Sequence, residues 1–260
     1  MNLDDFRCMR RGVQLAALHP EEKTLLAPIN QRNHKRQTAL LLLHGYSSSP
    51  AVYRKMMHHL PPYDATVVPV LPGHGNNLEA FAQTPAEEWL RAVELAYEQL
   101  AHEYEQVDVM GLSLGGVLAC HLANQFSLHH LYLLAPALNL HLPLNSTLKL
   151  VQTLRFLGFS AVRSAAGNLL TDDSCEIAYR QLPLASIMQI LSFIRDFSFK
   201  VPACPTDVFL GRHDAVVNSK AVAERFQHDS RVRIHWLDHS AHVLPLDGDI
   251  DQIITCMQKV

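Results

Sequence analysis

The sequence predicts an α/β protein with a mostly parallel central sheet, helices on both faces of that sheet and a helical lid insertion. Short apolar runs of strand character alternate with helix-like segments over residues 38–138. Such alternation is typical of parallel sheets, because a connection between parallel strands usually contains a helix. The alternation stops over residues 139–200, where apolar residues recur at helical spacing, and it resumes over residues 201–260.

These observations divide the 260 residues into three parts. Residues 1–37 are an N-terminal extension, with a helix expected over residues 4–19. Residues 38–138 and 201–260 form the core, and a chain that is 48% hydrophobic is long enough to fill it. Residues 139–200 form a helical lid or cap without strands. We expect this insertion near the carboxyl ends of the strands, where sites form in open parallel sheets.

The core is expected to contain six strands, each a short apolar run. They span residues 38–43, 65–71, 107–110, 128–136, 207–210 and 232–237. Four helices are expected over residues 51–60, 114–126, 219–226 and 247–257. A further helix should begin with Thr84 as its N-cap, Pro85 in the first helical position and Glu87 at the capping-box spacing.

Composition excludes several classes of function. The formal charge of −3 and the isoelectric point near 6.6 argue against a nucleic-acid partner, which would require a basic face. No apolar run approaches the ~20 residues of a membrane span, so stable membrane insertion is not expected. The sequence indicates no oligomeric state.

The cysteines and histidines predict neither cross-links nor a metal site. The five cysteines are widely spaced and lack C-x-x-C motifs, which makes a disulfide framework or a zinc site unexpected. This favours a reducing compartment, and the N-terminus lacks the basic start and apolar core of a secretory signal, so we expect a cytoplasmic protein. The sixteen histidines are scattered, and no metal is expected.

The segment Gly111-Leu112-Ser113-Leu114-Gly115-Gly116 lies between an expected strand and an expected helix. G-x-S-x-G in that context is a nucleophile elbow, a sharp strand-to-helix turn that exposes the serine hydroxyl. Gly111 and Gly115 lack side chains that would collide across the turn. Ser113 is therefore the candidate nucleophile for acyl transfer.

A serine nucleophile needs a base, and the base needs an orienting acid. Asp214 follows an expected strand, whereas Asp207 precedes that strand and would lie at the wrong end of the sheet. Between the two histidines after the next strand, His242 lies deeper in its loop than His239 and just before an apolar pair. The predicted catalytic residues are therefore Ser113, Asp214 and His242.

Two backbone N–H groups are expected to form the oxyanion hole. One belongs to Leu114, the residue after the nucleophile, and the other comes from the loop after the first core strand. That loop reads "HGYSSSP", in which Gly45 permits close approach of the backbone and Tyr46 supplies the N–H. Gly45, Tyr46 and Leu114 are thus the predicted substrate-binding residues. No cofactor is required, because water completes the second half-reaction.

The motifs "LLLHGYSSSP", "PVLPGHG", "GLSLGG", "FLGRHDAVV" and "HSAHVLPLD" resemble the α/β-hydrolase superfamily, and more narrowly its carboxylesterase and monoacylglycerol-lipase branch. The resemblance covers roughly residues 38–258 and includes residues 179–196, which look like the lid segment of those esterases. It implies an α/β-hydrolase fold. It also implies that Ser113, Asp214 and His242 are the triad, with Tyr46 and Leu114 as oxyanion donors.

The expected activity is hydrolysis of a small-molecule carboxylic ester. Dense apolar residues over 139–200 predict an apolar pocket, which suits a short-to-medium acyl chain or a monoacylglycerol. Other reactions share the same triad, so a thioesterase, a lactonase or a carbon–carbon bond hydrolase stays open as an alternative. A non-catalytic ligand-binding protein on a hydrolase scaffold is a more remote alternative.

Overall fold

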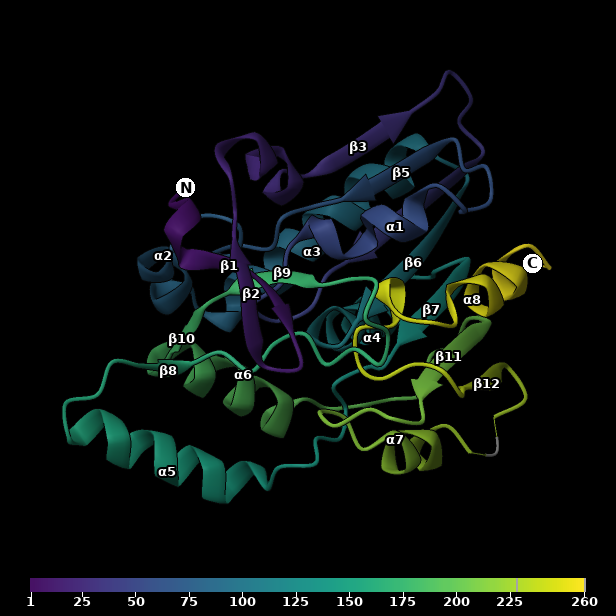
Figure 1. The fold of residues 1–260 in the computed structure, drawn as a ribbon. Helices are drawn as coiled ribbons and strands as arrows, with labels where there is room; N and C mark the ends of the chain where they lie inside the picture. Colours follow the sequence, from purple (N-terminus) through teal and green to yellow (C-terminus); the bar gives the residue numbers. More distant parts are fainter. Residues whose placement is uncertain (228, 260) are drawn as a thin grey trace.

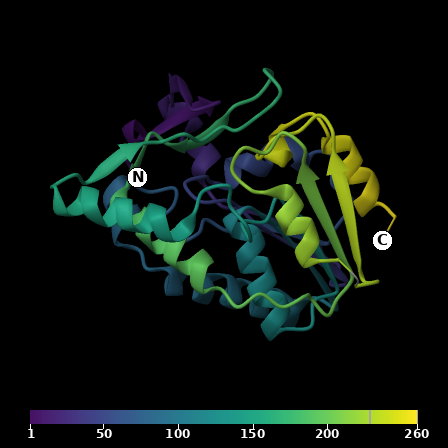
Figure 2. The ribbon, with the colours of Figure 1, turned by 90° about the horizontal axis from the view of Figure 1, so that it is seen from below.

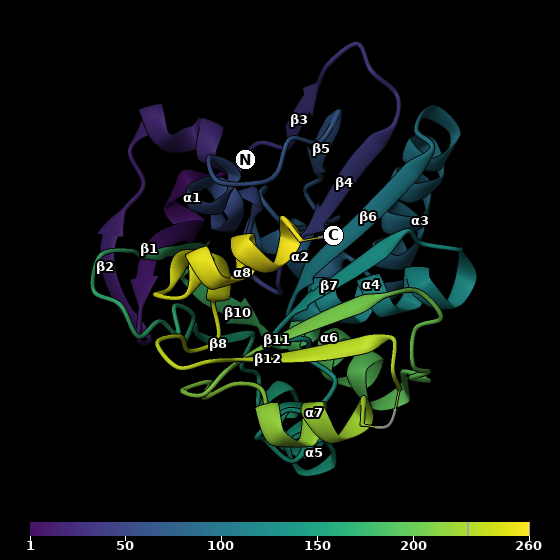
Figure 3. The ribbon, with the colours of Figure 1, turned by 90° about the vertical axis from the view of Figure 1, so that its right-hand side faces the viewer.

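A computed structural model describes residues 1–227 and 229–259, and a seven-stranded sheet forms its centre (Figures 1 and 3). Its strands are β3 (Ile29–Arg32), β4 (Thr38–Leu43), β5 (Ala65–Val68), β6 (Gln106–Leu112), β7 (His130–Leu134), β11 (Thr206–Gly211) and β12 (Val232–Leu237). Their spatial order is β12-β11-β7-β6-β4-β5-β3. All neighbours are parallel except β3, which pairs antiparallel with β5. The predicted fold class is confirmed.

Helices cover both faces of this sheet. One face packs against α3 (Ala86–Glu103), α4 (Leu114–Gln125) and α7 (Ser219–Arg225), and the other packs against α1 (Arg54–Met57) and α8 (Ile250–Met257). Figure 3 shows α8 on the opposite side of the sheet from α3 and α4. Because both faces are covered, a strand such as β4 is apolar at consecutive positions rather than at alternate ones.

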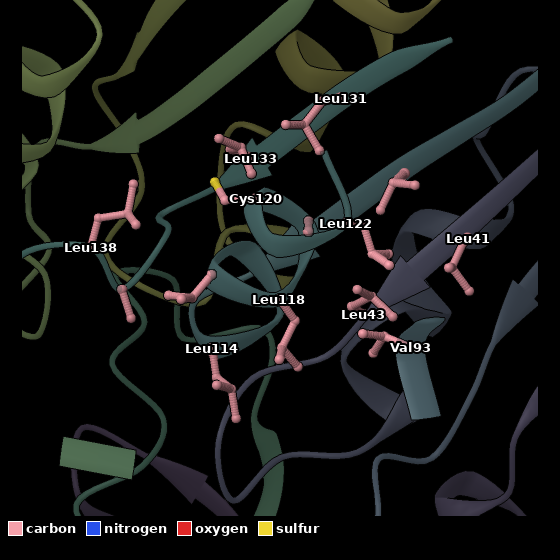
Figure 4. Close-up of a cluster of buried hydrophobic side chains, with 14 of the residues drawn as sticks. Leu41, Leu43, Val93, Leu114, Leu118, Cys120, Leu122, Leu131, Leu133 and Leu138 are labelled. Atoms are coloured by element: carbon pink, nitrogen blue, oxygen red, sulfur yellow. The ribbon is translucent and has the colours of Figure 1, made fainter. Parts of the chain in front are cut away.

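Strand β4 shows how one segment serves two cores. Leu41 and Leu43 belong to the core under α3 and α4, whereas Leu40 and Leu42 point to the core under α1 and α8. Figure 4 shows part of the first core, with labelled side chains from four elements and the segment after β7. They are Leu41, Leu43, Val93, Leu114, Leu118, Cys120, Leu122, Leu131, Leu133 and Leu138.

The N-terminal region does not form the expected helix. After the 3₁₀ turn η1 (Leu3–Asp5), β1 (Phe6–Arg10) and β2 (Val13–Ala17) form an antiparallel hairpin. Its two turn residues, Arg11 and Gly12, have φ of 50° and 72°, as a type I′ turn requires. The helix prediction was wrong because the buried residues Phe6 and Met9 face partners from a distant part of the chain.

The rest of the N-terminal region joins the core. The 3₁₀ helix η2 (Pro20–Leu26) leads into β3, the edge strand of the main sheet. The main sheet therefore begins before residue 37, the expected boundary between the N-terminal extension and the core. Residues before that division contribute one of the strands on which the core is built.

The insertion contains two long helices, as expected, but also strands that were not expected. Helices α5 (Leu144–Phe156) and α6 (Leu184–Asp196) lie side by side below the sheet in Figure 1, and Figure 2 shows them from below. Along the chain, the segment between these two helices contains β8 (Ala161–Arg163), β9 (Glu176–Tyr179) and β10 (Gln181–Pro183). Strand β9 pairs antiparallel with β1, so the hairpin and the insertion share a three-stranded sheet.

A disulfide joins these two regions and corrects the expectation from the cysteines. Cys8 in β1 is bonded to Cys175, at a sequence separation of 167 and with 5.5 Å between their Cα atoms. Sequence spacing could not indicate this bond, since only the β1–β9 pairing brings the two residues together. Because this disulfide is present, the cysteines no longer favour a reducing compartment.

Smaller differences concern helix starts. Thr84 ends α2 (Leu78–Gln83), where its hydroxyl donates to the Ala80 carbonyl, and Pro85 is the N-cap of α3. The Thr84 side chain, which was expected to cap α3, is therefore hydrogen-bonded to α2 instead. The segment before α1 forms the 3₁₀ helix η3 (Pro50–Tyr53), and η4 (Leu244–Leu246) precedes α8. Within residues 1–227 and 229–259, no helix is long and apolar enough to span a membrane.

Candidate active site

Ser113 occupies the sharp turn between β6 and α4. Its φ of 55° and ψ of −112° lie in a region that non-glycine residues rarely adopt. Hydrogen bonds hold this backbone in place: the Ser113 N–H donates to the Leu134 carbonyl at 3.0 Å, and the Ser113 carbonyl accepts from Gly116, Val117 and Ala137. A strained conformation persists only when its surroundings fix it in this way.

The glycines around Ser113 are required by space. A Cβ atom on Gly111 would lie 2.2 Å from the Gly115 carbonyl oxygen, and one on Gly115 would lie 2.0 Å from the Leu43 carbonyl oxygen. A Cβ atom on Gly116 would lie 2.8 Å from the Pro136 Cβ. Any side chain at Gly111 or Gly115 would therefore push the turn apart, in agreement with the steric role expected from the motif.

The structure pairs His242 with Asp214. The His242 Nδ1 lies 2.8 Å from Asp214 Oδ2, and both side chains are buried. The other carboxylate oxygen of Asp214 accepts from the backbone N–H groups of Val216 and Val217 at 2.7 and 2.8 Å. Because Nδ1 faces the carboxylate, the hydrogen belongs on Nδ1, and Nε2 is left as the nitrogen that can accept a proton.

Opposing effects act on the pKa of His242. Burial disfavours the imidazolium, but attraction to Asp214, the hydrogen bond between the two, and attraction to Glu176 outweigh it and raise the pKa above its usual value. The imidazolium that forms when His242 takes a proton is therefore stabilised by two buried carboxyl groups.

Ser113 and His242 line the same pocket, which has a volume of ≈ 470 Å³. Most of its wall is aliphatic and comes from the insertion, with Glu176 as the one acidic residue among its described lining residues. The aliphatic residues from α5, α6 and β10 are Leu150, Val151, Leu154, Leu182, Leu184, Ile187, Ile190, Leu191 and Ile194. The size and lining suit a small apolar ligand.

The predicted oxyanion donors also lie at this pocket. Gly45, Tyr46 and Leu114 all line it, and a Cβ atom on Gly45 would lie 3.4 Å from the Ser113 Cβ. Among the described residues, neither the Tyr46 N–H nor the Leu114 N–H has a backbone acceptor. Both amides are therefore available to an oxygen atom bound near Ser113. The Tyr46 hydroxyl lies 2.7 Å from the Ser186 hydroxyl of α6, so this loop is hydrogen-bonded to the insertion.

The two rejected candidates are engaged elsewhere. Asp207, near the start of β11, is fully buried and contacts His130, His235 and Arg233. His239 is exposed, and its backbone N–H donates to Asp249. Neither residue lines the pocket that holds Ser113.

Sequence reasoning missed two polar residues of the pocket wall, Glu176 and Asn168. Glu176 is buried, which raises its pKa, and its Oε2 accepts the Gly167 N–H at 2.8 Å. Both residues lie in the stretch expected to be helical, where no motif marks them. The insertion carries several other charged residues, so the charge of Glu176 does not single it out in the sequence.

The fold and this site define an α/β hydrolase. The profile of the alpha/beta hydrolase family matches residues 40–253, and the chain belongs to this family. The resemblance inferred from the motifs is therefore confirmed.

The similar proteins are esterases and lipases. The chain is 29% identical over 225 residues to a thermostable monoacylglycerol lipase of Bacillus sp. (strain H-257), covering 83% of this chain and 86% of the relative. It is 25% identical over 223 residues to a carboxylesterase of Bacillus subtilis (strain 168), covering 83% and 88%. These relatives make the chain an esterase- and lipase-like member of the family.

Solved structures support the same fold. A structure from work on LipS and LipT, two metagenome-derived lipolytic enzymes, superposes with a TM-score of 0.76 at 20% identity, covering 90% of this chain and 98% of that chain. A soluble variant of monoglyceride lipase from Saccharomyces cerevisiae gives a TM-score of 0.69 at 14% identity, covering 89% of both chains.

Proposed function

We propose that this protein hydrolyses carboxylic esters through a Ser113–His242–Asp214 triad and an acyl-enzyme intermediate. The observation that carries the proposal is a single aliphatic pocket with Ser113 and His242 in its wall and Asp214 bonded to the far side of His242. A strained serine, an oriented histidine and two free backbone amides are the parts that acyl transfer needs.

In the proposed reaction, Nε2 of His242 takes the proton of the Ser113 hydroxyl as Oγ attacks the ester carbonyl. The resulting oxyanion accepts hydrogen bonds from the Tyr46 and Leu114 amides. His242 then gives its proton to the leaving alkoxide oxygen, which departs as the alcohol and leaves the acyl group on Ser113. Water repeats the sequence, losing a proton to His242, and the acid is released as Ser113 regains its proton.

The pocket favours an uncharged, apolar acyl group of short-to-medium length, or a monoacylglycerol. Among the described residues, the lining contains no Lys or Arg that could pair with an acyl chain carrying a negative charge. Glu176 places one buried carboxyl group in the same wall, where it could accept hydrogen bonds from the free hydroxyls of a glycerol leaving group. The similarity to a monoacylglycerol lipase and to a carboxylesterase supports both substrate types.

A chain-length series of p-nitrophenyl esters, combined with a fluorophosphonate probe, tests this proposal. We expect hydrolysis of the shorter esters and labelling of the wild type but not of Ser113→Ala, with the exposed Ser198→Ala as a labelled control. Ser113→Ala and His242→Ala should each lower kcat by roughly 10⁴–10⁶, and the double variant should be scarcely worse, because the residues act as one unit.

Two outcomes would contradict the proposal. Labelling of Ser113→Ala at the wild-type rate would mean that another residue is the nucleophile. A double variant whose loss equals the product of the two single losses would mean that Ser113 and His242 act independently.

A further inference from the structure

One segment of the insertion crosses both loops that carry the proposed acid and base. It runs between β8 and β9 and includes Gly167 and Asn168. The loop after β11, which carries Asp214, is hydrogen-bonded to this segment, and so is the loop after β12, which carries His242. The insertion therefore contacts the catalytic loops directly as well as lining the pocket.

Asn168 makes the contacts to both loops. Its backbone carbonyl accepts the N–H groups of His242 and Val243, at 3.0 and 3.2 Å. Its side-chain Oδ1 accepts the N–H of Ala215, the residue after Asp214, at 3.0 Å. A single residue thus bonds one loop through its backbone and the other through its side chain.

The segment around Asn168 is itself held from two sides. The Gly167 carbonyl accepts the Arg11 N–H at 2.5 Å, and the Gly167 N–H donates to Glu176 at 2.8 Å. A Cβ atom on Gly167, whose φ is +80°, would lie 2.3 Å from the Met9 carbonyl oxygen, so the hairpin packs tightly against this point. On the other side, the Asp247 carboxylate accepts the Leu170 N–H at 2.9 Å.

We infer that Asn168 is a positioning residue that sets the alignment of Asp214 with His242. The inference rests on the proposed triad. Because the backbone of Asn168 fixes the base loop, its Oδ1 fixes the acid loop relative to that base. Asn168 acts on the reaction through the Asp214–His242 pair. It does not contact the reacting ester bond, which lies at Ser113.

The carboxamide oxygen of Asn168 is the atom that a variant can remove without deleting the backbone bonds. Asn168→Ala frees the Ala215 N–H and lets the Asp214 loop drift. A misplacement of ~1 Å costs about 100-fold in rate, so we expect kcat to fall by about 10- to 100-fold with KM changed by less than about threefold.

The pH profile separates positioning from a general loss of structure. Asp214 and Glu176 are the charged groups that act on the pKa of His242, and Asp247 accepts the N–H of Ala241, the residue before it. Loosening Asp214 weakens the attraction that favours the imidazolium, so Asn168→Ala should move the acid limb of kcat/KM to lower pH. Asn168→Asp keeps an oxygen acceptor for Ala215 and adds negative charge, so it should recover most of kcat and move the limb to higher pH.

Asn77→Ala is the matched control. Asn77 Oδ1 also accepts the N–H of an alanine, Ala80, at 2.8 Å, but at the start of α2 and away from both catalytic loops. This variant loses an N-cap and should have a lower Tm than the wild type, and its kcat and the acid limb of its pH profile should match the wild type. Thermal melting of all variants reports folding.

The outcomes decide between the inference and its failure. A loss of kcat in Asn168→Ala, with acid limbs moving in opposite directions in the Ala and Asp variants, supports it. Unchanged kcat in Asn168→Ala, or equal losses in both variants with unmoved limbs, overturns it. If Asn168→Ala does not fold, the acid limb of the kcat/KM profile of Asn168→Asp decides alone. A shift of that limb to higher pH supports the inference, and an unmoved limb overturns it. Ser113→Ala runs in parallel, since activity there would overturn the proposed function itself.

Discussion

At the scale of single residues, the site combines a strained serine with a histidine whose charged form two carboxyl groups stabilise. The backbone of Ser113 costs on the order of 1–3 kcal/mol, and four hydrogen bonds to neighbouring backbone groups hold it. His242 is hydrogen-bonded to Asp214, and Glu176 attracts its charged form. Glu176 therefore influences the proposed base through its charge.

This arrangement predicts the pH dependence of activity. His242 must be neutral to accept a proton, and its pKa is raised above its ordinary ~6.5. Activity should therefore rise with pH through a transition above ~6.5. Glu176→Gln removes one of the attractions that raise the pKa, so the transition should move to lower pH.

The profile of kcat/KM for a p-nitrophenyl ester, read at a wavelength unaffected by ionisation of the product, measures both transitions. Glu176→Gln should also lower the preference for a monoglyceride over the methyl ester of the same acyl chain. A transition that stays in place in Glu176→Gln would show that Glu176 carries no charge near His242.

At the scale of elements, β11 places two aspartates in different roles. Asp207 lies near the start of the strand. Asp214 follows the end of the strand, so the two aspartates lie at opposite ends of β11. Asp207 accepts hydrogen bonds from Arg233, His130 and His235, at 2.6 to 2.9 Å. Burial opposes its ionised form, but these three partners outweigh that effect and lower its pKa strongly.

Asp207 and Asp214 should therefore respond differently to the same substitution. Asp207→Asn breaks a buried charge cluster and should lower the free energy of unfolding by about 3 kcal/mol, with kcat of the folded protein unchanged. Asp214→Asn should lower kcat by about 10⁴ because the wrong tautomer of the histidine is favoured. Urea denaturation and steady-state kinetics of both variants measure the two effects.

The pH dependence of stability adds a check on Asp207. Its folded pKa lies below the unfolded value of ~3.9, so its contribution is present above that pH and is lost as the pH falls toward the folded pKa. The stability difference between the wild type and Asp207→Asn should shrink below about pH 4. A kcat loss in Asp207→Asn as large as that in Asp214→Asn would contradict the assignment of the acid.

At the scale of the whole molecule, the N-terminal hairpin and the insertion form one unit beside the core. Strand β1 pairs with β9, the Cys8–Cys175 disulfide joins them, and the hairpin turn is bonded to the segment that carries Gly167 (Figure 1). The residue after Cys175 is Glu176, which lines the pocket. The disulfide thus closes a long loop directly beside the candidate site.

Removing the disulfide should destabilise the protein. A loop of 167 residues predicts a loss of roughly 5 kcal/mol at most. Cys8→Ser and addition of a reductant should therefore each lower Tm, whereas Cys256→Ser, which removes a free thiol, should not. Thiol titration of the unfolded chain should find three groups without reductant and five with it. Five groups without reductant would rule out the bond.

The sequence alone is enough to predict the α/β fold class, the family, and Ser113, Asp214 and His242 as candidate residues, of which Ser113 and His242 line one pocket and Asp214 is hydrogen-bonded to His242. These features can be predicted because each depends on a short segment of the sequence. Buried strands in an α/β core are continuously apolar, and the turn at Ser113 needs glycines beside it. The position of Asp214 and His242 after successive strands follows from chain order alone.

The hairpin, the disulfide, and the positions of Glu176 and Asn168 depend on contacts between distant parts of the chain, so they are seen only in the folded structure. Cys8 and Cys175 lie 167 residues apart, and Asn168 meets Ala215 across 47 residues. Contacts at such separations leave no periodicity in either segment. Residues 4–19 therefore suggested a helix, whereas Phe6 and Met9 are buried where the hairpin pairs with β9.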